Sequence, residues 1–403
     1  MATVAHGLLA GLDDIAHVGR DRLRGGYSRH GFSSTDLELR DWFSQQAGAA
    51  GLDVETDRNG NLWAWWGVPG DDALVLGSHL DSVPGGGAYD GPLGIVSALD
   101  AVATLAREGF VPARPVAILV FVEEEGSRFG VACLGSRLMT GSIDSMDALR
   151  LTDQNDITLA EAVRSVGLDP HRMGRDEATL ARIGTFIELH VEQGRGLIDL
   201  DRPLGVASTI LAHGRWRLTV SGQGNHAGAT DMTDRRDPVV TAAQAILAIN
   251  DAARSAPGSR ATVGRLQVVP GGTNVIASRV HAWLDARAST DRQTRDLVST
   301  ISARLDTIAL ESGTAVSMTE ESWTSLVHFD ASLAAHTAGL LGDVPLLASG
   351  AGHDAGVLAG HRPSAMVFVR NPTGVSHSPE EFAELSDCIA GVDALITLVR
   401  ELA

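Results

Sequence analysis

The sequence has few cysteines and little positive charge, and these two shortages exclude several classes of protein. Cysteine occurs at two positions, Cys133 and Cys388, so neither a disulfide framework nor a thiolate metal site is expected, and both residues are predicted to be buried free thiols. Lysine and arginine number 32 against 50 aspartate and glutamate residues, which leaves a net charge of −18. This balance argues against a nucleic-acid partner and against a polybasic membrane patch.

Long apolar runs are also missing. No run reaches the roughly 18 residues that a membrane span requires. Residues 1–20 lack a charged segment followed by an apolar one, so we expect no signal peptide and a cytoplasmic location. The chain has 403 residues, of which 44% are hydrophobic, and it exceeds the size at which one core normally stops growing. Two domains are therefore expected.

Short apolar runs within residues 1–209 and 323–403 predict strands that are buried on both faces, separated by helix-like segments. Such runs are typical of a largely parallel sheet covered by helices on both sides. The fold class predicted for residues 1–209 and 323–403 is therefore α/β, with a mostly parallel mixed sheet flanked by helices. The predicted strands are residues 74–76, 116–122, 186–189 and 365–369.

The middle segment, residues 210–322, follows a different pattern, in which strand residues alternate between apolar and polar. Its elements are predicted in the order β-α-β-β-α-β, which is the ferredoxin-like arrangement of an inserted α+β domain. On the first helix of this segment we expect an apolar face, and the second helix has its own apolar repeat. The residues concerned are Val240, Ala243, Ile246 and Leu247 on the first helix and Leu297, Ile301, Leu305 and Ile308 on the second.

Imidazole and carboxylate side chains follow the predicted buried strands. His79 ends one strand, Glu124 and Glu125 follow another, and His190 and His377 follow two more. In open α/β sheets, ligands bind beyond the carboxyl ends of the strands, so these groups are expected at one edge. Taken singly, each has an ordinary structural explanation, such as a core histidine or a solvated acidic turn. Together they predict a metal site.

The mixture of imidazole and carboxylate donors suits Zn²⁺ or Mn²⁺, with Co²⁺ and Ni²⁺ as further possibilities. Asp90 lies in the Gly-rich loop after His79 and could bridge two ions through its two oxygens. Asp81 could accept the second ring N–H of His79 and fix its tautomer. A neighbouring glutamate that binds no ion could serve as the general base.

At these residues the chain resembles the metallopeptidase M20 superfamily, and within it the amidase branch known as the hydantoinase/carbamoylase family. Seven stretches carry the resemblance, and they occur in the family's order over nearly the whole chain. They are residues 77–82, 89–94, 124–129, 188–194, 225–228, 350–355 and 376–379.

The resemblance implies a zinc-exopeptidase-like catalytic domain with two divalent ions that share Asp90. The metal ligands that it implies are His79, Asp90 and His190 for one ion, and Asp90, Glu125 and His377 for the other. Glu124 would be the general base, and Asp81 would be a second catalytic residue beside it. The adjacent Glu123 leaves the register of the three successive glutamates open.

The resemblance also implies that the inserted domain acts as a lid and forms a homodimer interface. His226 would stabilise the oxyanion, reaching in from the other subunit. The residues implied for substrate binding are Gln193, Asn274, Arg287 and His353, of which Asn274 and Arg287 would hold a carboxylate. The chain departs from the family at residues 229–231, where Ala-Thr-Asp replaces Thr-Thr-Pro, which puts the lid turn in doubt.

The reaction implied is hydrolysis of the ureido amide of a small carboxylate-bearing substrate, with release of ammonia and carbon dioxide. Allantoate and N-carbamoyl-L-amino acids remain open as substrates. Two alternatives also remain: an M20-type aminopeptidase or dipeptidase, and a non-catalytic metal-binding homologue. The stretches around Arg128-Phe129 and residues 352–355 argue against the peptidase, and the complete ligand set argues against the inactive homologue.

Overall fold

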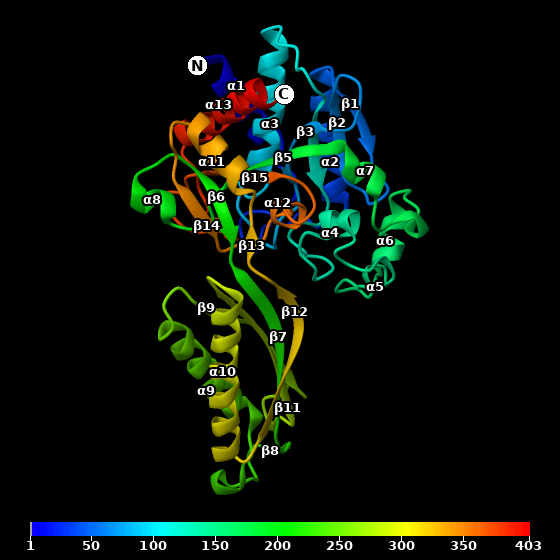
Figure 1. The fold of residues 1–403 in the computed structure, drawn as a ribbon. Helices are drawn as coiled ribbons and strands as arrows, with labels where there is room; N and C mark the ends of the chain where they lie inside the picture. Colours follow the sequence, from blue (N-terminus) through cyan, green and yellow to red (C-terminus); the bar gives the residue numbers. More distant parts are fainter. Residues whose placement is uncertain (1) are drawn as a thin grey trace. The chain divides into compact units, whose positions relative to one another are not determined.

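The computed structural model describes residues 2–403, and the chain divides into two compact units (Figure 1). The first unit comprises Met1–Ile210 and His328–Ala403, and the second comprises Leu211–Val327. The first junction lies between Ile210 and Leu211, one residue beyond the predicted boundary between residues 209 and 210. The second lies beyond the predicted residue 322, because strand β12 (Ala315–Thr324) continues the sheet of the second unit past that point.

The described part of the first unit is built on a nine-stranded mixed sheet in the order β1-β2-β4-β3-β5-β15-β6-β13, with β14 paired to β6. Its central strands β4, β3, β5 and β15 are mutually parallel, and every residue of β4 is buried. All four predicted apolar strands are present, and the mostly parallel α/β prediction is confirmed. The strands are β1 (Asp53–Thr56), β2 (Leu62–Trp66), β3 (Ala73–His79), β4 (Val116–Phe121), β5 (Ile183–Val191), β6 (Leu204–Ile210), β13 (Val327–His328), β14 (Leu346–Ser349) and β15 (Ser364–Val369).

Helices cover both faces of this sheet. Helices α1, α2, α3 and α13 share one hydrophobic core with the sheet, and α3 packs against both α1 and α13. The segments around α4 and α6 form a second core with Phe129 and Val122. The helices are α1 (Ala2–Asp14), α2 (Ser34–Ala49), α3 (Pro92–Arg107), α4 (Leu134–Thr140), α5 (Ser145–Ala148), α6 (Leu159–Ser165), η1 (Pro170–Arg172), α7 (Glu177–Arg182), α8 (Gly196–Leu200), α11 (Ala331–Leu340), α12 (Asp354–Leu358) and α13 (Leu385–Leu402).

The second unit, all of which is described, contains a four-stranded antiparallel sheet in the order β12-β7-β11-β9. Two helices, α9 and α10, pack on one face of it, as Figure 1 shows. The main elements follow one another in the predicted β-α-β-β-α-β order. They are β7 (Ala212–Ser221), β8 (Asn225–His226), η2 (Met232–Asp234), α9 (Pro238–Arg254), β9 (Arg260–Val269), β10 (Val275–Ile276), β11 (Arg279–Ala288), α10 (Asp291–Glu311) and β12.

The apolar face expected on α9 does not face the core. Val240 and Leu247 are 54% and 67% exposed. The helix packs on the sheet through other residues, among them Ala245 and Ile249. Two apolar stripes therefore run along one helix, and the stripe with Val240 and Leu247 faces solvent. By contrast, Leu297, Ile301 and Leu305 of α10 are buried, as predicted.

Two further features concern the cysteines and the helices. Cys133 and Cys388 are buried free thiols within the described chain. Among the described helices, none combines the length and the apolar character needed to cross a lipid bilayer.

Candidate metal centre

The carboxyl ends of four neighbouring parallel strands meet at one edge of the large sheet, and the predicted ligands follow them. Strand β3 ends at His79, β5 carries His190 next to its last residue, and the loop after β4 contains Glu124 and Glu125. His377 lies in the loop after β15. Because β4, β3, β5 and β15 are consecutive in the sheet, their ends place these side chains together.

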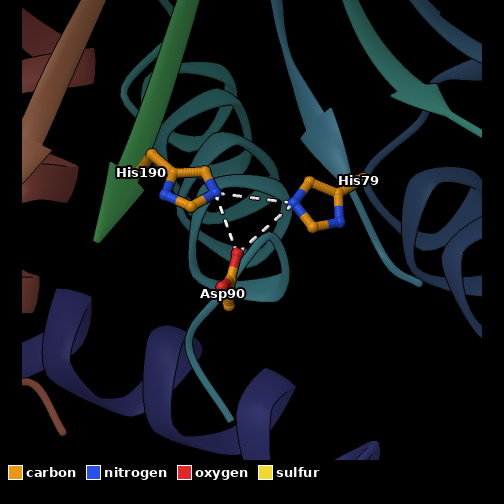
Figure 2. Close-up of side chains that lie close together, drawn as sticks. All are labelled: His79, Asp90 and His190. Atoms are coloured by element: carbon orange, nitrogen blue, oxygen red, sulfur yellow. Dashed lines mark hydrogen bonds and ion pairs between the residues drawn. The ribbon is translucent and has the colours of Figure 1, made fainter. Parts of the chain in front are cut away.

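His79, His190 and Asp90 form the first group of candidate ligands (Figure 2). Oδ1 of Asp90 lies 3.6 Å from Nε2 of His79 and 3.2 Å from Nε2 of His190, and the two Nε2 atoms are 3.4 Å apart. The opposite nitrogen of each ring faces a backbone carbonyl: Nδ1 of His79 lies 3.0 Å from Asp81 O, and Nδ1 of His190 lies 2.9 Å from Val191 O. With the protons on Nδ1, both Nε2 lone pairs point at one place.

The local charges favour a cation at this place. Burial lowers the pKa of His190, but the carboxylates of Asp90 and Glu188 outweigh it and raise that pKa to about 9. Burial raises the pKa of Asp90, yet the two imidazoles hold it well below its usual range. The buried carboxylates are therefore stabilised by nearby positive charge, which a divalent ion would supply.

Asp90, Glu125 and His377 form the second group. Nε2 of His377 lies 3.3 Å from Oε2 of Glu125 and 3.5 Å from Oδ2 of Asp90. The two oxygens of Asp90 are thus divided, with Oδ1 toward the first group and Oδ2 toward the second. This is the geometry expected of a bridging carboxylate. The half-exposed side chain of His377 is on the solvent side of the centre.

The structure separates the three successive glutamates. Glu123 has a left-handed backbone, with φ of 54°, and its carboxylate turns away to accept the N–H groups of Gly31, Arg128 and Phe129. Glu124 and Glu125 face the candidate ligands instead. The choice of Glu124 and Glu125 over Glu123 thus has a conformational basis.

Glu124 lies beside His79 and belongs to neither of these two groups of candidate ligands. Its Oε2 is 3.7 Å from Nε2 of His79, and its Oε1 accepts a hydrogen bond from the thiol of Cys133. Burial, opposed by His79 and reinforced by Asp81, raises the pKa of Glu124 to about 7. A carboxyl group that titrates near neutral pH is suited to take up and return a proton.

Asp81 contacts the candidate metal centre differently from the prediction, in which its carboxylate accepts the second ring N–H of His79. Its carboxylate lies 3.5 Å from Nδ1 of His79, but that nitrogen is closer to the backbone carbonyl of Asp81. The carboxylate accepts the backbone N–H groups of Glu124 at 3.1 Å and Glu125 at 3.0 Å. Asp81 therefore links the loop after β3 to the loop after β4.

Gln193 and His353, both predicted to bind substrate, lie beside the centre. The amide nitrogen of Gln193 is 2.8 Å from Oδ2 of Asp90, and its amide oxygen is a buried acceptor without a hydrogen-bond partner among the described residues. The ring of His353 packs on that of His190, with centroids 4.5 Å apart. Burial and the neighbouring His190 lower the pKa of His353 far below its usual range, so this ring is neutral.

The other predicted residues, His226, Asn274 and Arg287, belong to the second unit. His226 is exposed on β8, and its Nδ1 accepts the N–H groups of Gly228 and Ala229, each at 3.1 Å. Asn274 lies beside it, because its carbonyl accepts the N–H of Ala227.

Arg287 lies at the far end of β11 and is held by Asp285, at 2.7 Å from Nε and 2.8 Å from Nη2. From Arg279, which pairs with Ser221 near β8, the strand covers about 27 Å to Arg287 at about 3.4 Å per residue. His226 and Arg287 are therefore at opposite ends of the same unit.

The donor set fits divalent ions. Two imidazole nitrogens and several carboxylate oxygens converge from the strand ends, and each imidazole is oriented by a backbone carbonyl. Sequence reasoning missed one further carboxylate, Glu381, whose side chain contacts the loops of Asp90 and His377. Its only signal was its position in an acidic turn after His377, which any solvated loop could share.

A helix-covered parallel sheet with this donor set at its carboxyl edge defines a candidate metallohydrolase. The chain belongs to peptidase family M20/M25/M40, whose model matches residues 75–401. It is 38% identical over 401 residues to the N-carbamoyl-L-amino acid amidohydrolase of Geobacillus stearothermophilus, with 97% of each chain covered. It is 31% identical over 391 residues to the allantoate amidohydrolase of Bacillus subtilis, with 94% of each covered.

Solved structures agree with this assignment. An amidase of the hydantoinase/carbamoylase family from Burkholderia vietnamiensis superimposes with a TM-score of 0.90 at 30% sequence identity, covering 99% of this chain and 97% of that one. The mixed α/β fold with its mostly parallel central sheet is therefore shared with a solved amidase.

Proposed function

We propose that this chain is a metal-dependent amidohydrolase that cleaves the ureido amide of an N-carbamoyl-L-amino acid, releasing ammonia and carbon dioxide. The observation that carries the proposal is the divided Asp90 carboxylate beside Glu124, which combines a bridging ligand with a base whose pKa is about 7. The 38% identity to an N-carbamoyl-L-amino acid amidohydrolase supports this substrate class. Allantoate is the second candidate, supported by the 31% identity to an allantoate amidohydrolase.

Two divalent ions, Zn²⁺ or Mn²⁺ first and Co²⁺ or Ni²⁺ next, are proposed for the centre. His79, Asp90 and His190 would hold one ion, and Asp90, Glu125 and His377 the other. When bound, such ions supply Lewis-acid activation of a water and of the substrate carbonyl.

The proton transfers are assigned to Glu124. It takes a proton from the attacking water and delivers it to the nitrogen that leaves. Cys133 and the backbone N–H bonds that Asp81 accepts hold Glu124 in place for both steps. Because Glu124 is almost fully buried, no bulk water competes for the proton.

His226 is proposed to stabilise the negative charge that develops on the carbonyl oxygen. Its Nδ1 accepts two backbone N–H groups, so the ring proton is on Nε2, which can donate to an oxyanion. Asn274 lies next to it and Arg287 offers a planar fork to a carboxylate. Gln193, whose amide oxygen has no hydrogen-bond partner among the described residues, is proposed to accept from the terminal ureido nitrogen.

A homodimer through the second unit is proposed, and the separation of two residues within that unit supports it. A ureido substrate is far shorter than the distance of about 27 Å along β11, so one copy cannot offer both His226 and Arg287 to the same substrate molecule. We therefore assign one of them, His226, to the partner copy. The exposed Val240 and Leu247 of α9 and the open edge of β9, where Leu266 is 46% exposed, provide an apolar surface for that copy.

Ammonia release from metal-loaded enzyme tests the function. N-carbamoyl-L-amino acids, allantoate, N-carbamoyl-β-alanine and a panel of dipeptides would be compared side by side. We expect turnover of N-carbamoyl-L-amino acids, with loss of activity after chelation and recovery on adding metal. Turnover of allantoate alone would select the second substrate class. Cleavage of dipeptides with silence on every ureido compound would contradict the proposal and favour a peptidase.

A further inference from the structure

Glu381 is a buried carboxylate that joins the loops of two candidate metal ligands. It lies in the segment between β15 and α13, four residues after His377, and is only 4% exposed. Its Oε1 accepts the backbone N–H groups of Asp90 at 2.9 Å and Tyr89 at 3.1 Å. Its Oε2 accepts the hydroxyl of Ser376 at 3.2 Å. One side chain therefore connects segments that are about 290 residues apart in sequence.

The fit around this carboxylate is close. A Cβ atom at Gly87 would lie 2.2 Å from Oε1 of Glu381, so the loop before Asp90 can pass only because residue 87 is glycine. Ser376 extends the connection on the other side, since its hydroxyl oxygen lies 3.1 Å from the amide nitrogen of Gln193. The hydroxyl has one proton, for which Oε2 of Glu381 at 3.2 Å and Oδ2 of Asp90 at 3.3 Å are both acceptors, while its oxygen accepts from Gln193.

Without bound cations, the negative charge of Glu381 is unfavourable. The carboxylate is buried next to Asp90, and no arginine or lysine is among its hydrogen-bond partners in the described chain. A buried carboxylate beside another is costly unless cations compensate both. Two divalent ions at Asp90 would provide that compensation, and Glu381 would in return increase the attraction of the centre for them.

We propose that Glu381 is a positioning residue of the metal centre, which holds the Asp90 loop and the His377 loop at the spacing needed for Asp90 to bridge. Its contribution is made through the backbone of Asp90 and the hydroxyl of Ser376, not through contact with substrate. The inference deepens the proposed function, because it depends on the metal centre on which that function rests. It does not depend on which amide is cleaved.

Metal affinity of the purified metal-free protein tests this role. Zn²⁺ and Mn²⁺ would be titrated in competition with a chelator into wild type, Glu381→Gln and Glu381→Ala, and the thermal unfolding of each metal-free protein would be recorded. Glutamine keeps an acceptor for the two N–H groups but removes the charge, so we expect affinity about 10-fold weaker. Alanine removes both, and a loss approaching 100-fold is expected, as for other groups that orient metal ligands.

The matched control is Asp36→Asn. Asp36 is also a buried carboxylate, 6% exposed, and it accepts a backbone N–H, that of Phe32, and a guanidinium, that of Arg40. This variant should lower the unfolding temperature without changing metal affinity. If both Glu381 variants bind metal as wild type does, whatever their stability, the positioning role is wrong.

The outcome also separates this inference from the proposed function. A wild type that binds metal and hydrolyses no ureido compound would contradict the function and leave the Glu381 test intact. A wild type that binds no divalent metal at all would overturn both. Weaker binding in Glu381→Ala, with partial recovery in Glu381→Gln, supports the inference.

Discussion

His79 and His190 face each other with their Nε2 atoms 3.4 Å apart, while the opposite nitrogen of each ring donates to a backbone carbonyl. Without a cation, the raised pKa of His190 keeps a proton on that ring. A divalent ion between the two Nε2 atoms would displace this proton and take up both lone pairs. The carbonyl acceptors belong to Asp81 and Val191, so the backbone at the strand ends fixes the tautomers. The fold itself thus prepares both histidines to bind a cation.

Replacing Glu124 by glutamine should lower kcat by about 100- to 10,000-fold, because the amide cannot take the proton of the attacking water. Metal content should not change, since Glu124 belongs to none of the groups of side chains that could hold an ion. Steady-state ammonia release and metal analysis of the same preparation provide the measurement.

Glu123→Gln is the matched control for that variant. Glu123 accepts three backbone N–H groups and faces away from the ligands, so its loss should lower the unfolding temperature while most activity remains. If Glu123→Gln abolished turnover and Glu124→Gln did not, the assignment of the base would have to move by one residue.

Gly91→Ala should weaken metal binding at least 10-fold. Gly91 has φ of 86°, and a Cβ atom there would lie 2.5 Å from the ring of His79, so the imidazole must move. Gly67→Ala is the control, because Gly67 has φ of 84° but no atom within 4 Å of the added Cβ. Both variants place an alanine at a positive φ, which is strained for a residue with a Cβ atom. Chelator competition should detect a loss of affinity in Gly91→Ala alone; an equal loss in both would show that backbone strain is the cause.

Asp100→Asn should stabilise the protein at high pH but not at low pH. Asp100 lies on α3 against Gly7 of α1, and burial raises its pKa to about 6. The folded state therefore holds this proton more tightly than the unfolded state does. Wild-type stability should fall as the pH rises from about 4 to about 6, by roughly 1–3 kcal/mol from this group.

Thermal unfolding of wild type and Asp100→Asn at pH 4.5 and pH 8 measures the difference. The variant should unfold at a higher temperature at pH 8, and the gap should narrow at pH 4.5, where the wild-type carboxyl is protonated. Asp393→Asn, an exposed change on α13, is the control and should show no such gap at either pH. A gap of equal size at both pH values would mean that charge burial is not the cause.

Mixing His226→Ala chains with Glu124→Gln chains should restore activity if His226 acts on the partner's substrate. A heterodimer would contain one complete site, with Glu124 from one chain and His226 from the other. Random pairing puts half the chains in heterodimers, so about a quarter of wild-type activity is expected. No recovery, with subunit exchange verified by differently tagged chains, would place His226 in the site of its own chain.

The sequence predicted which candidate ligands lie close together, because parallel strands end at one edge of a sheet. Once residues 116–122 and 186–189 were assigned as buried strands, the side chains after them had to meet. The choice among the three glutamates was harder, since it depends on the left-handed backbone of Glu123, which no apolar pattern reveals. The family resemblance supplied that register.

Other features could not be predicted from pattern alone. Helix α9 has two apolar stripes, and the more hydrophobic one, with Val240 and Leu247, is exposed, so hydrophobicity alone indicated the wrong face. The role of Glu381 depends on contacts with the loop of Asp90, far away in sequence, and periodicity carries no information on such contacts. The second domain boundary moved because β12 continues to Thr324 through an irregularity after Glu320.

The first and last strands of the second unit, β7 and β12, are neighbours in its sheet and pair as far as His213 and Thr324. The chain passes into and out of the second unit along these two strands. While this insertion is unfolded, the first unit can bring β6 and β13 together only by closing a loop the length of the whole insertion. Closure entropy grows with loop length, so that step becomes easier once β7 and β12 have paired. We therefore expect the insertion to fold first. Its paired strands then shorten the loop that must close before β6 and β13 of the first unit can come together.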